Sequence, residues 1–256
     1  MLLAHELSGD PNAPATVLVH GITENRETWR PIIEALAADH RVLAVDLRGH
    51  GASEHVPPYD PARYGGDVAE TIAATGLTDP LIVGHSLGGV VVTAVPAFCP
   101  DVVGVVNVDQ PLELGGFRSG LQMIEPMLRG TDEEFAQAIA MVFDGMSGAL
   151  SGDALERVRA IRRPDRDVVL GTWALILEAE PSDLDVALDG LFAGVGDRPY
   201  LSLHGIDPGP DYADWLQARI SRAVVEVWPD LGHYPMLVEQ QRFLDRLAAF
   251  EREVRE

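Results

Sequence analysis

The sequence predicts an α/β protein built on a mostly parallel β-sheet, with a block of helices inserted into it. Short apolar runs alternate along the chain with stretches of helical periodicity, which is typical of right-handed βαβ units. Several of these runs are almost continuously β-branched, as expected of strands that are buried on both faces. From residue 111 to residue 197 the pattern predicts helices and no strand.

The first elements follow from apolar runs and turn residues. His5–Ser8 is predicted to form a short edge strand, and Ala15–His20 a buried strand that ends at Gly21. A helix is predicted over Trp29–Ala38, and Arg41–Val45 is the next strand. Two strands separated by a helix indicate a parallel βαβ unit.

The middle of the chain repeats this pattern. A helix is predicted over Arg63–Thr75, a strand over Leu81–Val83, a helix over Leu87–Ala97 and a strand over Val102–Val108. The valines of Val90–Val95 favour a strand by intrinsic propensity. We nevertheless predict a helix there, because burial can override a preference of only a few tenths of a kcal/mol per residue.

The second half is predicted to hold the helical insertion and then the last strands. Strands resume at Tyr200–His204 and Val224–Trp228, with a helix over Tyr212–Ile220 between them and a closing helix over Met236–Val254. We therefore expect a core domain of residues 1–110 and 198–256, and a helical lid of residues 111–197 over the strand ends where α/β sheets bind ligands. Its helices are expected at residues 112–128, 132–146, 154–161, 165–179 and 184–192.

Composition and charge limit the possible partners. Of 256 residues 46% are hydrophobic, and 40 acidic against 19 basic residues give a formal net charge of −21. Such a field repels nucleic acid and anionic membranes, so we expect a small-molecule partner, with monomer and homodimer left open. The start of the chain shows no basic leader, and no run approaches the ~20 apolar residues of a membrane helix, which predicts a cytoplasmic protein. The single cysteine, Cys99, is expected to be packed and inert.

The pentapeptide Gly84–Gly88 (GHSLG) lies between the strand at Leu81–Val83 and the helix that follows. A serine on so tight a strand-to-helix turn is held in strained backbone geometry, which lifts its hydroxyl clear of the chain. Gly84 and Gly88 lack the Cβ atoms that would collide where strand and helix cross. The segment is therefore predicted to be a nucleophile elbow around Ser86.

Four motifs together resemble the α/β-hydrolase fold superfamily over essentially the whole chain, with lidded bacterial esterases and lactonases as the most similar branch. They are His20-Gly21, Asp46–Ser53 (DLRGHGAS), Gly84–Gly88 and Gly232-His233. The resemblance implies a doubly wound, mostly parallel sheet of about eight strands, with a helical lid after the sixth strand. It also implies a serine hydrolase that needs no cofactor.

The residues indicate how such chemistry would run. A serine hydroxyl is a weak nucleophile at neutral pH, so Ser86 needs a base, and a histidine can accept and return the proton. The resemblance places that base at His233, in the glycine-bearing loop after the last strand. Two residues compete for the acid of the triad: Asp207, which we favour, follows the seventh strand, and Asp109 follows the sixth. We expect the favoured acid to hold the imidazole in one tautomer.

Further site residues are predicted around the triad. The resemblance assigns the backbone N–H groups of Ile22 and Leu87 to the oxyanion hole. Glu24 and Arg26 are expected in a solvated polar loop, with the substrate entrance as the alternative. No metal-ligand spacing or phosphate loop occurs, so no metal or cofactor is expected. Candidate substrate contacts are His85, although the elbow should turn it away from the pocket, and the apolar lid residues Phe117, Met123, Phe143 and Trp173.

The sequence thus predicts a hydrolase that cleaves a carboxylic ester or lactone through an acyl-enzyme. The resemblance argues against dehalogenases and epoxide hydrolases, because those relatives carry aspartate where this chain has Ser86. Within the same fold a perhydrolase, a thioesterase or a carbon–carbon bond hydrolase stays open. A non-catalytic receptor that uses the lidded pocket is the alternative from another class.

Overall fold

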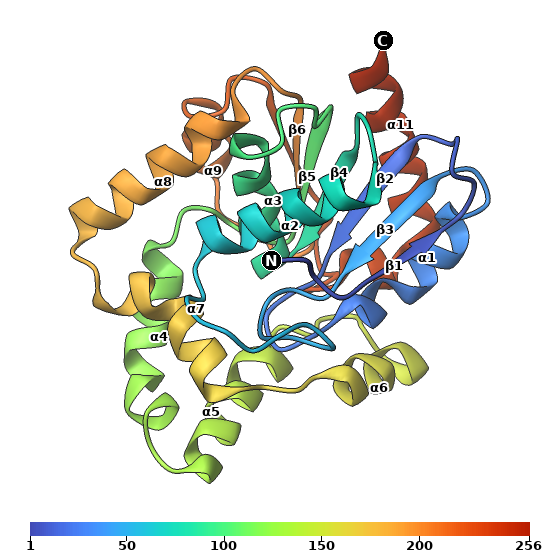
Figure 1. Cartoon of the computed structure of the whole chain (residues 1–256). Coiled ribbons are helices and arrows are strands. Elements are labelled where there is room, and N and C mark those ends of the chain that lie inside the picture. Colours follow the sequence, from blue (N-terminus) through green and yellow to red (C-terminus); the bar gives the residue numbers. More distant parts are fainter.

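The computed structural model describes residues 1–256, including the side chains of all residues except Pro181. Its core is a seven-stranded sheet in the order β1-β3-β2-β4-β5-β6-β7 (Figure 1). Strand β1 pairs antiparallel with β3, and every other pair is parallel. The strands are β1 His5–Ser8, β2 Ala15–Val19, β3 Arg41–Val45, β4 Leu81–His85, β5 Gly104–Val108, β6 Tyr200–His204 and β7 Ala223–Val227.

The α/β class and the mostly parallel sheet are confirmed, with seven strands where the family resemblance suggested about eight. The seven strands that form are those predicted from the sequence.

The expected closing helix is interrupted at Glu239 and forms α10 and α11. The other helices and 3-10 segments are η1 Arg26–Trp29, α1 Arg30–Leu36, α2 Pro61–Thr75, α3 Leu87–Ala94, η2 Val95–Ala97, α4 Gly115–Leu128, α5 Asp132–Asp144, α6 Gly152–Ile161, α7 Arg166–Glu178, α8 Pro181–Val195 and α9 Tyr212–Gln217; α10 spans Pro235–Val238 and α11 Gln240–Arg255. Among the residues described, none of these helices combines the length and apolar character needed to cross a bilayer.

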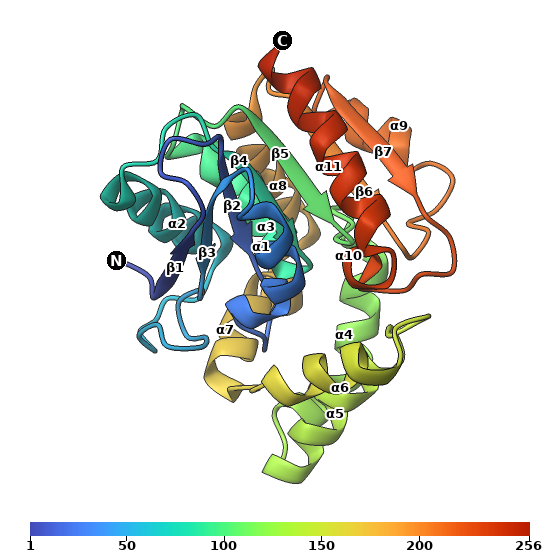
Figure 2. The ribbon, with the colours of Figure 1, turned by 90° about the vertical axis from the view of Figure 1, so that its right-hand side faces the viewer.

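Alternating strand residues face two separate apolar cores. In β2, Val17 and Val19 pack with α2 and α3, whereas Leu18 points to the opposite face, towards α1 and α11. Figures 1 and 2 show α2 and α3 on one side of the sheet, and α1 and α11 on the other. Because both faces are covered, the central strands β2, β3, β4 and β5 are largely apolar. The edge strands β1 and β7 are partly exposed and carry polar residues.

Helix α3 forms despite the β-branched residues that favour a strand. Val91, Val92 and Val95 are fully buried against the sheet and the neighbouring helices. Each buried valine gains about 1.5–3 kcal/mol, which exceeds its helix-propensity cost of a few tenths. Tertiary packing therefore decides the conformation of the segment.

Helices α4 to α8 follow one another between β5 and β6, and we call them the cap. Thr131 and Glu134 form a capping box at the start of α5, which fixes where that helix begins. Figure 2 shows α4 to α7 gathered beyond the carboxyl ends of the strands. Helix α8 leads back to the core, where it packs on α3 and η2.

Candidate active site

Ser86 occupies a strained turn between β4 and α3. Its backbone has φ 53° and ψ −124°, a conformation that non-glycine residues rarely adopt. A Cβ atom on Gly84 would lie 2.0 Å from the carbonyl oxygen of Gly88, and one on Gly88 would lie 2.3 Å from that of Val19. The two glycines are therefore required where the helix crosses the strand, and the elbow geometry expected from the sequence is present.

His233 and Asp109 are joined by a short buried hydrogen bond. The imidazole Nδ1 donates to Asp109 Oδ2 at 2.6 Å, and both side chains are almost fully buried. Asp109 Oδ1 accepts the backbone N–H groups of Gly205 at 2.7 Å and Ile206 at 3.0 Å. Burial alone would raise the pKa of Asp109, but these hydrogen bonds and the neighbouring imidazole hold it below its ordinary value. The carboxylate is thus ionised and fixed in one orientation.

Asp207, the favoured acid in the sequence, does not occupy this position. Its side chain is exposed, and its Oδ1 accepts the N–H of Gly209 at 2.8 Å in its own loop. The loop after β6 supplies backbone N–H groups to Asp109 instead of a carboxylate to His233. The preference for Asp207 as the acid was therefore wrong. Asp109, the alternative acid, is the carboxylate that contacts His233.

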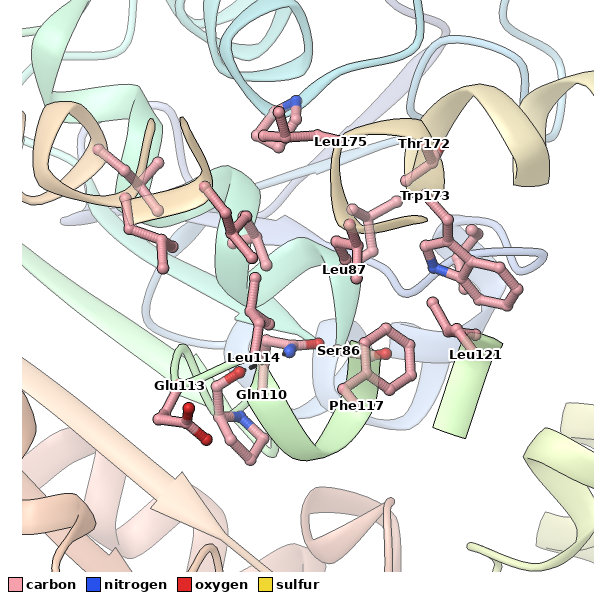
Figure 3. Close-up of a pocket in the computed structure, with 18 of the residues that line it drawn as sticks. Ser86, Leu87, Gln110, Glu113, Leu114, Phe117, Leu121, Thr172, Trp173 and Leu175 are labelled. Atoms are coloured by element: carbon pink, nitrogen blue, oxygen red, sulfur yellow. Dashed lines mark hydrogen bonds between the residues drawn. The ribbon is translucent and has the colours of Figure 1, made fainter. Parts of the chain in front are cut away.

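Ser86 and His233 line the same cavity, of about 1030 Å³. Because Nδ1 of His233 carries the proton that it donates to Asp109, Nε2 holds a free lone pair. Among the residues described, that buried Nε2 has no hydrogen-bond partner. Figure 3 shows Ser86 among the side chains that line this cavity, together with Phe117 and Trp173. The serine hydroxyl and the imidazole of His233 thus line one shared cavity.

Two backbone N–H groups near Ser86 are available as donors. Leu87 is the first residue of α3, so its N–H has no acceptor within the helix. Ile22 lies in the loop after β2, and both residues line the cavity. This loop approaches the elbow closely, since a Cβ atom on Gly21 would lie 3.1 Å from the Cβ of Ser86. In the described part of the chain neither N–H donates to another protein group.

His85 lies behind the site and does not contact the cavity. Its Nε2 donates to the carbonyl oxygen of His233 at 2.7 Å, and its side chain is fully buried. The expectation that His85 contacts substrate is therefore wrong. Its ring lies 4.6 Å from the ring of His233 and 4.8 Å from that of Tyr234, between centroids. His85 thus packs against the loop that carries the other histidine.

Glu24 is buried beside His85 instead of lying in a solvated loop. Its carboxylate accepts hydrogen bonds from Tyr234 and Thr28 and lies 3.8 Å from Nδ1 of His85. Burial would raise the pKa of Glu24, but these contacts lower it to about 2. No local pattern indicates that this carboxylate is buried, because its partner Tyr234 is 210 positions away along the chain. Arg26 likewise pairs with the buried Asp46.

The cap supplies much of the cavity wall. Phe117, Phe143 and Trp173 line the cavity, and the rings of Phe117 and Trp173 meet edge to face at 5.9 Å. Met123 was expected beside them but is 79% exposed and lies outside the lining. The reason is the orientation of α4, which turns Leu121 and Ile124 inward and Met123 to solvent.

A loop of the cap is in backbone contact with the loop that carries His233. A Cβ atom on Gly148 would lie 2.4 Å from the Cα of Gly232, and one on Gly232 would lie 2.6 Å from the Cα of Gly148. In addition, the N–H of His233 donates to the carbonyl oxygen of Met146 at 2.8 Å. The paired glycines were not recognised from the sequence, since the contact is long-range.

Among the described residues, no three His, Cys, Asp or Glu side chains are grouped so that they could hold a metal ion. The cavity itself presents a hydroxyl, an imidazole, carboxylates and backbone N–H groups.

Comparison with known proteins agrees with the fold. Residues 16–246 match the model of the alpha/beta hydrolase family, and the chain belongs to that family. The pimeloyl-[acyl-carrier protein] methyl ester esterase of Sodalis glossinidius is 30% identical over 232 residues, which cover 84% of this chain and 80% of that protein.

Other similarities are partial or concern the fold alone. Epoxide hydrolase A of Mycobacterium tuberculosis is 39% identical over 103 residues, and the aligned part spans only 32% of that protein. A putative aryl esterase from Burkholderia cenocepacia superposes with a TM-score of 0.80 at 24% identity, over 98% of this chain and 94% of that one. These relatives share the fold and differ in the reactions that their names describe.

Proposed function

We propose that this protein is a serine hydrolase that cleaves a carboxylic ester or lactone of a small, largely apolar molecule through an acyl-enzyme. Ser86 is the proposed nucleophile, His233 the base and Asp109 the acid that orients it. The observation that carries the proposal is the joint geometry of these residues. Ser86 and His233 line one cavity, and Nδ1 of His233 is occupied by Asp109, so that Nε2 is left as a base.

In the proposed first half-reaction, Nε2 of His233 takes the hydroxyl proton of Ser86 as Oγ attacks the carbonyl carbon. The N–H groups of Ile22 and Leu87 stabilise the oxyanion of the tetrahedral intermediate, and each such donor is worth about 3 kcal/mol. Collapse expels the alkoxide, which takes the proton from the imidazolium and leaves as the alcohol. Asp109 stabilises the imidazolium while it exists and stays ionised itself.

The second half-reaction repeats these steps with water. His233 takes a proton from the water molecule, the resulting hydroxide attacks the acyl carbon, and Ser86 leaves with the proton returned. For a lactone the alcohol stays attached to the acyl group, so the product is a single hydroxy acid. The apolar walls supplied by Phe117, Phe143 and Trp173 support a largely apolar substrate.

The test is labelling with a fluorophosphonate followed by mass spectrometry of the peptides. We expect an adduct on Ser86 in the unaltered protein and none in Ser86→Ala. Ser119→Ala, which changes an exposed serine on α4, is the matched control and should label normally. A folded protein that leaves Ser86 unmodified would contradict the proposal and favour a receptor. A panel of p-nitrophenyl esters and lactones then separates esterase from lactonase activity.

A further inference from the structure

We propose that one branch of the cavity, between α3 with η2 on one side and α8 on the other, binds an uncharged, linear hydrocarbon chain of the substrate. The inference rests on the proposed function, because it names the substrate class for the same site. An ester with a medium-length alkyl chain and no charge at the chain end fits it best.

The first wall of the branch is one face of α3 and η2. Leu87, Val90, Ala94 and Ala97 all line the cavity, at intervals of three, four and three residues. Positions with this spacing share one side of a helix, so the four residues form an apolar stripe, whose edge at Ala94 packs against Gly65 of α2. The stripe begins next to Ser86 and extends for roughly 15 Å, because a helix rises 1.5 Å per residue. A chain attached to the acyl carbon would lie along it.

The second wall is the facing side of α8. Gly194 touches η2 directly, since a Cβ atom there would lie 2.8 Å from the Cβ of Ala97. Gly190 is one turn earlier on the same side, lines the cavity, and would carry a Cβ atom with nothing within 4 Å. The two helices therefore meet at Gly194 and diverge towards the nucleophile. The open space is walled on this side by Leu184, Ala187, Leu188, Gly190 and Leu191.

The charges around the cavity exclude an anionic chain end. Four carboxylates line the cavity, and among the lining residues there is no arginine, while the sequence contains no lysine. A carboxylate carried into this branch would lose its hydration without gaining a cation. The wider field of a protein with a net charge of −21 acts in the same direction. The four lining carboxylates are Asp60, Asp109, Glu113 and Asp207.

The experiment compares three p-nitrophenyl esters that share a leaving group: the acetate, the octanoate and the suberate monoester, whose chain is as long as the octanoate but ends in a carboxylate. We expect kcat/KM for the octanoate to exceed that for the acetate by at least about tenfold, since each buried methylene contributes about 0.8 kcal/mol. The octanoate should exceed the suberate by at least about a hundredfold. Similar values for all three esters would overturn the proposal.

Variants locate the chain in this branch. Gly190→Leu should lower kcat/KM for the octanoate by about tenfold and leave the acetate within about twofold, because the new side chain enters the branch and not the site of bond cleavage. Gly66→Leu, on α2 and outside the cavity lining, also has open space for its Cβ and should change neither value. Ala187→Arg should raise the relative rate with the suberate, because it supplies the missing cation. Equal losses for acetate and octanoate in Gly190→Leu would contradict the placement.

A binding measurement keeps this inference separate from the proposed reaction. Calorimetry with Ser86→Ala compares methyl octanoate with monomethyl suberate, and the same comparison is made after adding Gly190→Leu. Preferential binding of methyl octanoate that is lost with Gly190→Leu supports the chain site even if no ester is turned over. Absence of both turnover and a Ser86 adduct would contradict the proposed function alone.

Discussion

Nε2 of His85 donates a hydrogen bond to the carbonyl oxygen of His233 at 2.7 Å, so the residue before the proposed nucleophile is tied to the backbone of the proposed base. The two histidines are 148 positions apart in the chain. The bond therefore links the end of β4 to the loop after β7. The relative position of these two segments would decide the proposed proton transfer from Ser86 to His233. Four predictions test this bond and the contacts made by Asp109, Gly84 and His40.

His85→Leu should destabilise the protein by about 1–3 kcal/mol, because the buried carbonyl of His233 loses its donor. His85→Gln, whose amide can donate, should recover part of that loss. Urea unfolding measures the stability, and the turnover of a p-nitrophenyl ester reports on the placement of His233. His55→Leu, at a half-exposed histidine, is the control and should stay within about 0.5 kcal/mol of the parent. A leucine variant that is as stable and active as the glutamine variant would contradict the assigned role of the bond.

Asp109→Asn should lower kcat by roughly 10⁴-fold, as removal of the acid does in related triads, because an amide facing Nδ1 favours the wrong imidazole tautomer. Asp207→Asn is the matched control. Its carboxylate is exposed and bonded only within its own loop, so the variant should keep kcat within about twofold. The measurement is steady-state kcat of both variants on the same ester. A larger loss of kcat in Asp207→Asn than in Asp109→Asn would assign the acid of the triad to Asp207.

Gly84→Ala should destabilise the protein by more than about 3 kcal/mol, because its Cβ atom would overlap the carbonyl oxygen of Gly88 and neither backbone can move freely. Gly66→Ala makes the same chemical change inside α2 with nothing near the new methyl group. It should stabilise the helix by about 0.5–1 kcal/mol. Thermal unfolding of both variants provides the measurement, and equal shifts would refute the steric explanation of the elbow.

His40 joins the start of β3 to α11 through a pH-dependent contact. Its Nε2 lies 2.6 Å from Glu251, and its Nδ1 lies 2.6 Å from Asp39. The hydrogen bond to Glu251 is the largest effect on the pKa of His40 and raises it, and the hydrogen bond to Asp39 raises it further. Burial acts in the opposite direction, but the pKa is raised overall. The pKa of Glu251 is lowered despite its burial, helped by His40 and Arg255, so its carboxylate stays ionised at neutral pH.

A pKa that is raised on folding contributes stability fully below the ordinary value of about 6.5, and the contribution is lost as the pH rises through the raised value. His40→Gln should therefore cost roughly 1–2 kcal/mol near pH 6, and less at about pH 9. Urea unfolding of parent and variant across this range gives the difference. His5→Gln serves as the control at a partly buried histidine outside the contact. A difference that grows with pH would contradict the assignment.

Most of the fold could be predicted because burial on both faces makes the central strands recognisable without tertiary information. The ranges of β1, β3 and β6 are those expected, and α3 was foreseen by allowing burial to override propensity. The break between α10 and α11 was missed, since the helical pattern runs through Glu239 without a glycine or proline.

The candidate site could be predicted from the residues alone where a local motif fixes the backbone, whereas His233 was located through the family resemblance. Ser86 is such a case, because the flanking glycines have a steric reason that can be read from the sequence. The choice between Asp109 and Asp207 depends on which loop supplies N–H groups and which supplies the carboxylate, and each loop carries an aspartate shortly after its strand. The roles of His85 and Glu24 depend on partners more than a hundred positions away.

The contact between Gly148 and Gly232 has a consequence for how molecules enter and leave. Because Met146 also accepts the N–H of His233, swinging the whole cap outward as one piece would pull the imidazole away from the serine. The contact therefore couples two states of the molecule. A cap that is swung fully open and an imidazole of His233 placed beside Ser86 exclude each other. A molecule that enters or leaves while the proposed catalytic residues stay in place must therefore pass between cap helices that can separate without moving Gly148 and Gly232.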